Sequence, residues 1–198
     1  AVLDKKFNNP IVASIWAADH LVKNGDEFIK SLKTAHEYSQ KTGKMVSIDV
    51  NPTYPNIHVG YIKVGKMIEK IDGMALFEFV KQVEKPDLKK AKEFLQRWEY
   101  LWHAGYKVWS AKKMLAFYDK HEPAMYKGLM AIQKSWGSES QDETIRANYP
   151  KFNKISVDYA VFEKMDPKEI VVLSADLGWS DIGAWNILKD ELSLNTAD

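Results

Sequence analysis

The sequence predicts an α/β fold in which a mixed central sheet is flanked by helices. Residues 11–16 and 170–173 are short, continuous apolar runs of the kind found in buried strands. Residues 25–43 instead carry apolar side chains at helical spacing and end in a glycine, a common helix C-cap. Strands that alternate with helices along one chain are typical of an α/β sheet.

Length and composition narrow the class of protein. The 198 residues include no low-complexity segment or linker, so we expect one α/β domain over residues 1–198, with a largely helical insertion at about 110–165. A net charge of +1 argues against a nucleic-acid partner. No apolar run approaches the roughly 18 residues of a membrane span, which argues against a membrane partner. The absence of cysteine excludes disulfides and fits a cytoplasmic protein.

The first half of the chain predicts two groups of strands. Residues 11–16 are expected to form a central parallel strand, and residues 45–50 complete a strand–helix–strand unit with it. Residues 59–64 and 67–71, separated by Gly65-Lys66, are expected to pair antiparallel with each other outside the main sheet.

The second half of the chain predicts two aromatic strands and several helices. A strand that carries Phe77 and Phe79 stops at Pro86, and Asp87 then caps a helix. Residues 100–109 predict a strand, and Ser110 caps the next helix. Residues 121–149 are amphipathic and break near residues 137–138, and residues 156–162 start a further helix. We expect three tryptophans to lie in the core: Trp98, Trp102 and Trp109.

An acid and a base stand together where the predicted strand stops at Pro86. Glu84 can accept hydrogen bonds from hydroxyl groups and Lys85 can attract a phosphate, a combination that suits a sugar phosphate. Taken alone, these residues also fit an ordinary solvent-exposed strand end. The other motifs of the chain are needed to distinguish the two interpretations.

Two aspartates follow predicted strands far apart in the sequence. Asp19 and Asp181 could together hold one Mg²⁺, which needs few protein ligands, although each could also cap a helix. We interpret His20 as structural, because phosphoryl transfer depends on positioning more than on a base. His103, beside Gly105, is equally compatible with donating to a sugar or phosphate oxygen and with a structural role.

Seven motifs occur in a specific order and cover most of the chain: Ala18-Asp19-His20-Leu21-Val22, Asn51-Pro52-Thr53-Tyr54-Pro55, Gly60-Tyr61-Ile62, Val83-Glu84-Lys85-Pro86, Leu101-Trp102-His103-Ala104-Gly105, Ser156-Val157-Asp158-Tyr159-Ala160 and Gly178-Trp179-Ser180-Asp181-Ile182-Gly183. In this order they resemble the mannose-1-phosphate guanylyltransferase (GDP-mannose pyrophosphorylase) family of the sugar nucleotidyltransferase superfamily. The resemblance implies the Rossmann-like nucleotide-diphospho-sugar transferase fold.

The resemblance also implies a reaction and roles for residues. Mannose 1-phosphate and GTP would be the substrates, with Mg²⁺ as cofactor, and GDP-mannose and pyrophosphate the products. Asp19 and Asp181 would be the metal ligands and, with Lys85, the catalytic residues. Six residues would bind the acceptor: Gly60, Tyr61, Glu84, Lys85, His103 and Asp158. The resemblance leaves open whether the chain forms a homodimer.

The chain departs from the family pattern at several positions. Ala17 stands where the family has proline, His58-Val59 precede Gly60-Tyr61, and His103 replaces an asparagine. The family's Gly-rich phosphate loop and its nearby lysine do not occur in these residues, so we expect an N-terminally truncated fold. We therefore expect an incomplete enzyme that binds GTP poorly and turns over negligibly as an isolated chain.

Two other functions remain open at this stage. One is a nucleotidyltransferase for another hexose 1-phosphate, and the other is a non-catalytic sugar-phosphate-binding or regulatory subunit. Calorimetry with mannose 1-phosphate and glucose 1-phosphate distinguishes the two enzymes. The reading frame upstream of Ala1 distinguishes an enzyme from a regulatory subunit.

Overall fold

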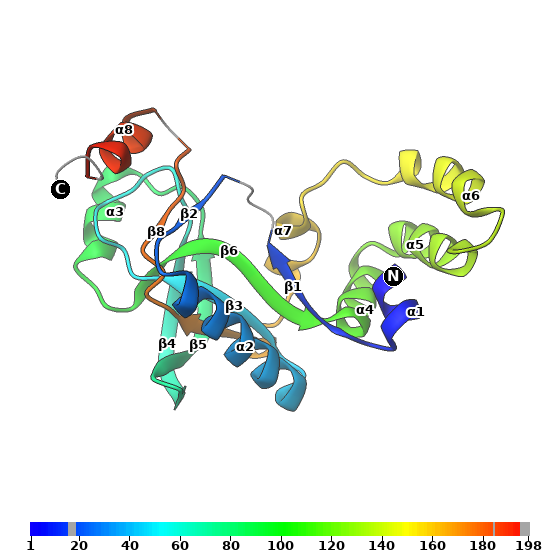
Figure 1. Ribbon diagram of the computed structural model, residues 1–198, viewed down its shortest axis with the longest axis horizontal. Coiled ribbons are helices and arrows are strands. Elements are labelled where there is room, and N and C mark those ends of the chain that lie inside the picture. The colour runs from blue at the N-terminus through cyan, green and yellow to red at the C-terminus, as the bar shows by residue number, and fades with distance from the viewer. Residues whose placement is uncertain (16–18, 184, 195–198) are drawn as a thin grey trace.

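The computed structural model describes residues 1–15, 19–183 and 185–194, and its centre is a six-stranded mixed sheet (Figure 1). The strand order is β1-β6-β3-β7-β5-β4, and an additional pairing joins β4 to β6. β3 and β7 run parallel, whereas the other pairs are antiparallel. The strands are β1 Ile11–Ile15, β3 Met45–Val50, β4 Tyr61–Ile71, β5 Met74–Val83, β6 Tyr100–Ser110 and β7 Ile170–Ser174. This is the mixed α/β architecture that the sequence predicts.

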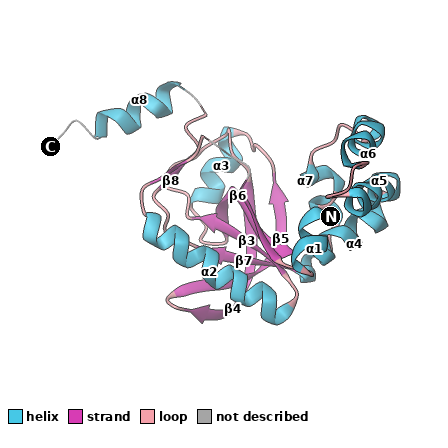
Figure 2. Ribbon diagram, turned by 45° about the vertical axis from the view of Figure 1, so that its right-hand side comes forward, coloured by secondary structure: helices cyan, strands magenta, loops and turns pink. Residues whose placement is uncertain are grey.

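The helices surround the sheet unevenly (Figure 2). They are α1 Val2–Phe7, α2 Gly25–Thr42, α3 Leu88–Leu95, α4 Ala111–His121, α5 Pro123–Ser135, α6 Gln141–Asn148, α7 Val157–Ala160 and α8 Trp185–Leu194. α1, α4, α5 and α6 gather at one end of the molecule, and α8 lies at the opposite end. Across the described ranges, no helix combines the length and apolarity needed to cross a membrane.

Helix α2 shows how local sequence and packing agree. Its buried face includes Ala35 and Tyr38 and packs against β1, β3 and β6. The helix ends at Gly43, whose φ of 69° is a left-handed conformation that costs glycine little. Its N–H donates to the carbonyl of Ser39 at 2.8 Å and closes the last turn.

Strand β6 organises the sheet, because it pairs with β1, β3 and β4. Its apolar side chains join both large clusters of the core: Trp102 and Tyr106 pack in one, and Trp109 packs in the other. Both faces of this strand are therefore covered, as expected for an aromatic run of this length.

The prediction of a central parallel strand at residues 11–16 is wrong. β1 pairs antiparallel with β6, and β6 separates it from β3. β1 and β3 do run in the same direction, as a strand–helix–strand unit requires, but they are not neighbours. Ile15 is 48% exposed, because no second strand among the described residues covers the outer edge of β1. Trp16, the last residue of the predicted strand, lies outside the described residues.

Residues 61–71 form one long strand, so the predicted break at Gly65-Lys66 is also wrong. β4 pairs with β5 along its whole length and belongs to the main sheet. The glycine accommodates an irregularity in pairing, since a Cβ on Gly65 would lie 3.0 Å from a Glu78 carboxylate oxygen. The turn comes later, at Asp72 and Gly73, with φ of 50° and 85°. Asp-Gly is a favoured pair for a two-residue hairpin turn.

Between β6 and β7 the described chain contains helices and no strand. Asp87 and Ser110 cap α3 and α4 as predicted, by accepting from the backbone N–H of Lys90 and Lys113. The predicted helix at residues 156–162 is a single turn, α7, followed by a 3₁₀ turn. Trp102 and Trp109 are buried, but Trp98 is 72% exposed, so its placement in the core was wrong.

Three short elements escaped prediction. α1 packs against α4 and α5, and Gln133 in α5 donates to the carbonyl of Ala1 at 2.8 Å. The two-residue strands β2 (Leu21–Val22) and β8 (Trp179–Ser180) pair antiparallel beside the main sheet. Neither strand is long enough to show an alternating pattern in sequence.

Replacing Tyr61 by phenylalanine should destabilise the fold. The Tyr61 side chain is fully buried, and its hydroxyl accepts a hydrogen bond from the Asn56 N–H at 3.1 Å. Removing the hydroxyl leaves that buried donor unpaired, at a cost of about 1–3 kcal/mol. Urea unfolding of Tyr61→Phe should show a lower midpoint with an unchanged m-value. Tyr149→Phe is the control, because Tyr149 is 67% exposed, and an equal loss in both variants would contradict the prediction.

Candidate sugar-phosphate site

One row of strand pairing brings together residues from four strands. Val83 of β5 lies opposite Tyr61 of β4, which lies opposite Trp102 of β6, which lies opposite Val50 of β3. Side chains alternate between the faces of a sheet, so the residues next to these four point the other way. Those neighbours are Glu84, Gly60, His103 and Asp49.

The Glu84 carboxylate lies directly over Gly60. A Cβ added to Gly60 would stand 2.6 Å from Glu84 Oε2 and 3.4 Å from the Cβ of His103. The His103 N–H donates to the Gly60 carbonyl at 2.8 Å, which fixes the two backbones against each other. Gly60 thus provides the space that the carboxylate occupies, while Tyr61, on the other face, packs in the core.

Lys85 has an unusual backbone conformation. Its φ is 39°, in the left-handed region, and it directly precedes Pro86, which is buried. Left-handed conformations of non-glycine residues are strained and concentrate at functional sites. The lysine side chain is exposed, so its ammonium group is available to an anion.

Glu84 and Gln82 line a cavity of about 380 Å³. Its opposite wall comes from the 3₁₀ turns that follow α7, with Phe162, Met165 and Pro167. A pyranose ring with one phosphate fits within this volume, and the mixed polar and apolar lining is typical of ligand pockets.

His103 occupies an irregular part of β6. The register between β3 and β6 shifts between Ile48 and Val50, opposite Gly105, whose φ is 79°. Bulges of this kind re-aim side chains at binding sites. His103 Nδ1 lies 3.3 Å from Gln82 Nε2, which also lies 3.4 Å from Glu84 Oε2. Burial, followed by the charge of Lys107, holds the pKa of His103 well below its usual 6.5, so the imidazole is neutral at physiological pH.

A buried polar network that the sequence analysis missed lies behind His103. Lys107 Nζ lies 2.8 Å from His103 Nε2 and 2.8 Å from Ser47 Oγ, and Ser47 Oγ lies 2.6 Å from Asp49 Oδ2. Asp49 is fully buried and Lys107 is 3% exposed. The available signal was an ionisable residue inside each of two otherwise buried strands, because charges are rarely buried without partners.

Asp158 lies within electrostatic range of Lys107 in this buried network. It lies in α7, and its charge acts to raise the pKa of Lys107, against the lowering that burial causes. Its Oδ1 atom is buried and has no hydrogen-bond partner among the described residues. A buried acceptor without a partner is uncommon and is often explained by a ligand or water.

Asp19 and Asp181 meet at the small β2–β8 ribbon. Leu21 pairs with Ser180, so extending the register by one residue places His20 opposite Asp181. The charges of both aspartates act to raise the pKa of His20, although burial is the larger effect and lowers it overall. Both carboxylates therefore lie within electrostatic range of His20, and their pairing around a metal stays a prediction.

His20 is held by aromatic neighbours. The indole N–H of Trp179 donates to His20 Nδ1 at 3.0 Å, and the Tyr106 hydroxyl lies 3.1 Å from the same nitrogen. Both rings also make edge contacts with the imidazole. These contacts fix the ring beside the two aspartates, and they fit the structural role assigned from the sequence.

The surroundings of Asp181 suit a divalent cation. Asp181 Oδ1 is buried and lacks a hydrogen-bond partner among the described residues. The next residue, Ile182, has a φ of 42°, which is rare for a β-branched side chain. Two carboxylates can hold Mg²⁺ when phosphate and water complete its octahedron, so Asp19 and Asp181 fit this ion. The described residues include no cluster of three or more histidine, cysteine, aspartate or glutamate side chains that could hold a metal.

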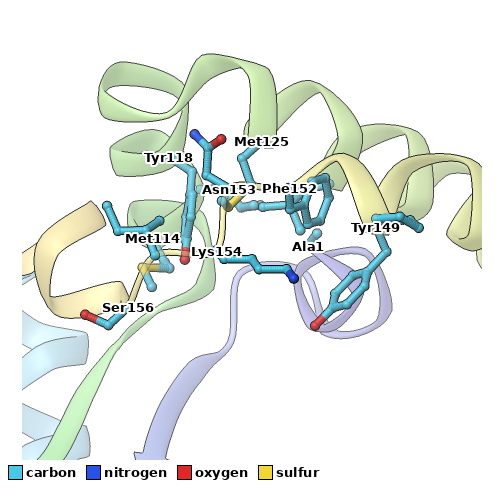
Figure 3. A pocket seen from close by; sticks show the side chains of 13 residues that line it. Ala1, Met114, Tyr118, Met125, Tyr149, Phe152, Asn153, Lys154 and Ser156 are labelled. Carbon is cyan, nitrogen blue, oxygen red and sulfur yellow. The ribbon is translucent and has the colours of Figure 1, made fainter.

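A separate cavity lies among the helices (Figure 3). It has a volume of about 720 Å³ and is lined by side chains of α4, α5 and the segment that connects α6 to α7, including Met114, Tyr118 and Phe152. Its lining includes none of the site residues that the sequence predicts, so its size does not make it the candidate site.

Comparisons with known proteins identify the family and the fold of this chain. Residues 1–196 match the nucleotidyl transferase family model. A mannose-1-phosphate guanylyltransferase of Escherichia coli is 34% identical over 184 residues, covering 91% of this chain. The mannose-1-phosphate guanylyltransferase RfbM of Salmonella typhimurium is 33% identical over 180 residues, covering 89%. The chain spans only 38% and 36% of the lengths of these two relatives.

Two solved structures share the fold. The first, described as a mannose-1-phosphate geranyltransferase from Thermus thermophilus, superposes with a TM-score of 0.78 at 24% identity and covers 97% of this chain and 52% of its own. The second, a mannose-6-phosphate isomerase from Helicobacter pylori, gives a TM-score of 0.64 at 22% identity and covers 90% of this chain and 68% of its own. These likenesses show the fold, and the match over residues 1–196 shows that the chain belongs to the nucleotidyl transferase family.

Proposed function

We propose that this chain forms the acceptor-binding and metal-binding part of a mannose-1-phosphate guanylyltransferase. The reaction transfers GMP from GTP to mannose 1-phosphate and releases GDP-mannose and pyrophosphate. The observation that carries the proposal is the position of the Glu84 carboxylate over Gly60, beside the strained, exposed Lys85. The relatives named above support the choice of mannose 1-phosphate and GTP.

The residues would act by positioning. The Glu84 carboxylate accepts hydrogen bonds from hydroxyl groups of the sugar, and the Lys85 ammonium binds its phosphate. Holding the phosphate oxygen in line with the α-phosphorus of GTP converts an encounter of two molecules into a reaction within one complex. Gly60 leaves room for the Glu84 carboxylate, and His103 lies beside Gln82, which lines the same cavity as Glu84.

Asp19 and Asp181 would hold Mg²⁺ in this proposal. The bound ion supplies charge neutralisation for the crowded phosphates during transfer. The unpartnered Asp181 Oδ1 supports this role. A cytoplasmic location would give the protein access to both substrates and to magnesium.

Glu84→Gln should weaken the binding of mannose 1-phosphate. The amide removes the charge that strengthens hydrogen bonds from sugar hydroxyls, a loss of about 1.5–3 kcal/mol. The dissociation constant measured by calorimetry should therefore rise on the order of 10- to 100-fold.

Glu93→Gln is the matched control for this experiment, because it makes the same change on an exposed position of α3. Glucose 1-phosphate and mannose 6-phosphate are titrated in parallel with the wild-type chain. Equal affinities for all three sugars, or equal affinities of wild type and Glu84→Gln for mannose 1-phosphate, would contradict the proposal.

Asp181→Asn should weaken divalent-cation binding. Mn²⁺ can replace Mg²⁺ at oxygen sites, and its binding is followed by the relaxation of water protons. Losing one of two carboxylates should raise the Mn²⁺ dissociation constant about tenfold or more, because the ion's main attraction to the site is charge. Asp176→Asn, an exposed aspartate five residues earlier, should leave the constant unchanged. If Asp181→Asn and Asp176→Asn both bind Mn²⁺ with the wild-type dissociation constant, Asp181 is not a ligand of the ion.

A further inference from the structure

A directional chain of hydrogen bonds links the buried network to the wall of the sugar site. An ammonium group can only donate, so Lys107 donates to Ser47 Oγ and to His103 Nε2, each at 2.8 Å. Ser47 in turn donates to Asp49 Oδ2 at 2.6 Å, a short distance typical of a bond to a carboxylate. The other oxygen, Asp49 Oδ1, accepts from the Ala104 N–H at 3.2 Å. Asp49 therefore anchors both the lysine and the irregular backbone beside His103.

Lys107 is buried close to an aromatic ring and under the influence of two carboxylates, and burial has the larger effect, so its pKa is lowered overall. Nζ lies 5.4 Å from the centre of the Phe162 ring, close enough for a cation–π contact. Burial lowers the pKa of Lys107, and the carboxylates of Asp49 and Asp158 act to raise it again. Burial likewise raises the pKa of Asp49, whereas Lys107 and its two hydrogen-bond donors lower it. Each charge thus opposes the effect of burial on the other. The contacts of Nζ are those of a donor, because the Ser47 proton goes to Asp49 and leaves the Ser47 oxygen to accept from Lys107.

The charged lysine determines which nitrogen of His103 carries the proton. The imidazole is neutral, so it holds one proton, and Nε2 must accept from the ammonium. The proton therefore resides on Nδ1, which faces the side-chain amide of Gln82 at 3.3 Å. A protonated Nδ1 requires an acceptor, and the amide satisfies it by turning its oxygen toward the ring, since the two ends of an amide are nearly equal in shape.

This orientation matters to Glu84. As placed, Gln82 Nε2 donates to Glu84 Oε2 over a long 3.4 Å. Turning the amide puts its oxygen at that position, and because two acceptors cannot bond to each other, Glu84 loses this donor. The carboxylate then keeps its acceptor capacity for another partner. The cavity that Gln82 and Glu84 line is the nearest place for such a partner.

We propose that Lys107 is a positioning residue that fixes the proton of His103 on Nδ1, orients the Gln82 amide and thereby reserves the Glu84 carboxylate for hydroxyl groups of the acceptor. The ligand part of this inference rests on the function proposed above. The proton arrangement does not, because it follows from the contacts of Lys107 alone.

The first test determines which ring nitrogen of His103 carries the proton in the wild-type chain. Nitrogen-15 NMR at neutral pH distinguishes a protonated ring nitrogen from an unprotonated one, and His103→Asn identifies the signal among the five histidines. The expected spectrum has the proton on Nδ1 of His103 and an unprotonated Nε2. A proton on Nε2 overturns the proposal.

The second test removes the ammonium. Lys107→Met should give a mixture of the two tautomers and raise the dissociation constant of mannose 1-phosphate about fivefold, because one interaction of a carboxylate is at stake. Asp49→Asn combined with Lys107→Met removes both buried charges, so the same readouts can be made if the single variant does not fold. Lys112→Met, at an exposed position of α4, is the control and should change neither readout.

Each result decides a separate point. An unchanged tautomer in the lysine variants, or a changed tautomer with unchanged affinity, overturns the positioning role. Wild-type protein that shows the expected tautomer and binds no mannose 1-phosphate refutes the proposed function and the ligand part of this inference, and it leaves the assignment of the proton established. Thermal unfolding of every variant separates these effects from a general loss of stability.

Discussion

The site depends on the pairing of β6 with its neighbours. β6 pairs with both β3 and β4, so one register sets the positions of residues from distant parts of the chain. A shift of one residue would turn His103 toward the core and Trp102 toward the site, since alternate side chains point to opposite faces. The aromatic residues of β6 prevent such a shift, because Trp102 and Tyr106 fill the core only in the observed register.

The two buried ionisable residues, Asp49 and Lys107, lose solvation energy when the protein folds. Two ions removed from water lose several kcal/mol of solvation each, and a well-packed apolar pair in their place is often as stable. The Asp49–Lys107 pair is therefore weak evidence for stability. Its hydrogen bonds continue through His103 to Gln82, and the positioning role proposed for Lys107 rests on that connection rather than on stability.

The two halves of the site differ in charge. Lys85 presents an ammonium beside the Glu84 carboxylate, a combination suited to a phosphate and hydroxyl groups on one molecule. Around Asp181 the field is negative, with Asp19 close to the same imidazole. Trp102 contributes to the wall of a smaller cavity next to this acidic half, so the aromatic strand connects both regions.

The sequence by itself determined the mixed α/β class, the capped helices and the Glu84-Lys85-Pro86 strand end, because these follow from local periodicity, capping and backbone restriction. Tertiary structure decided the rest. It placed β1 at an edge, joined residues 61–71 into one strand and left Trp98 exposed, since strand order and burial depend on which distant segments meet. It also paired Asp49 with Lys107 across β3 and β6. No local pattern encodes that pairing, because the energy of a buried charge depends on a partner 58 positions away.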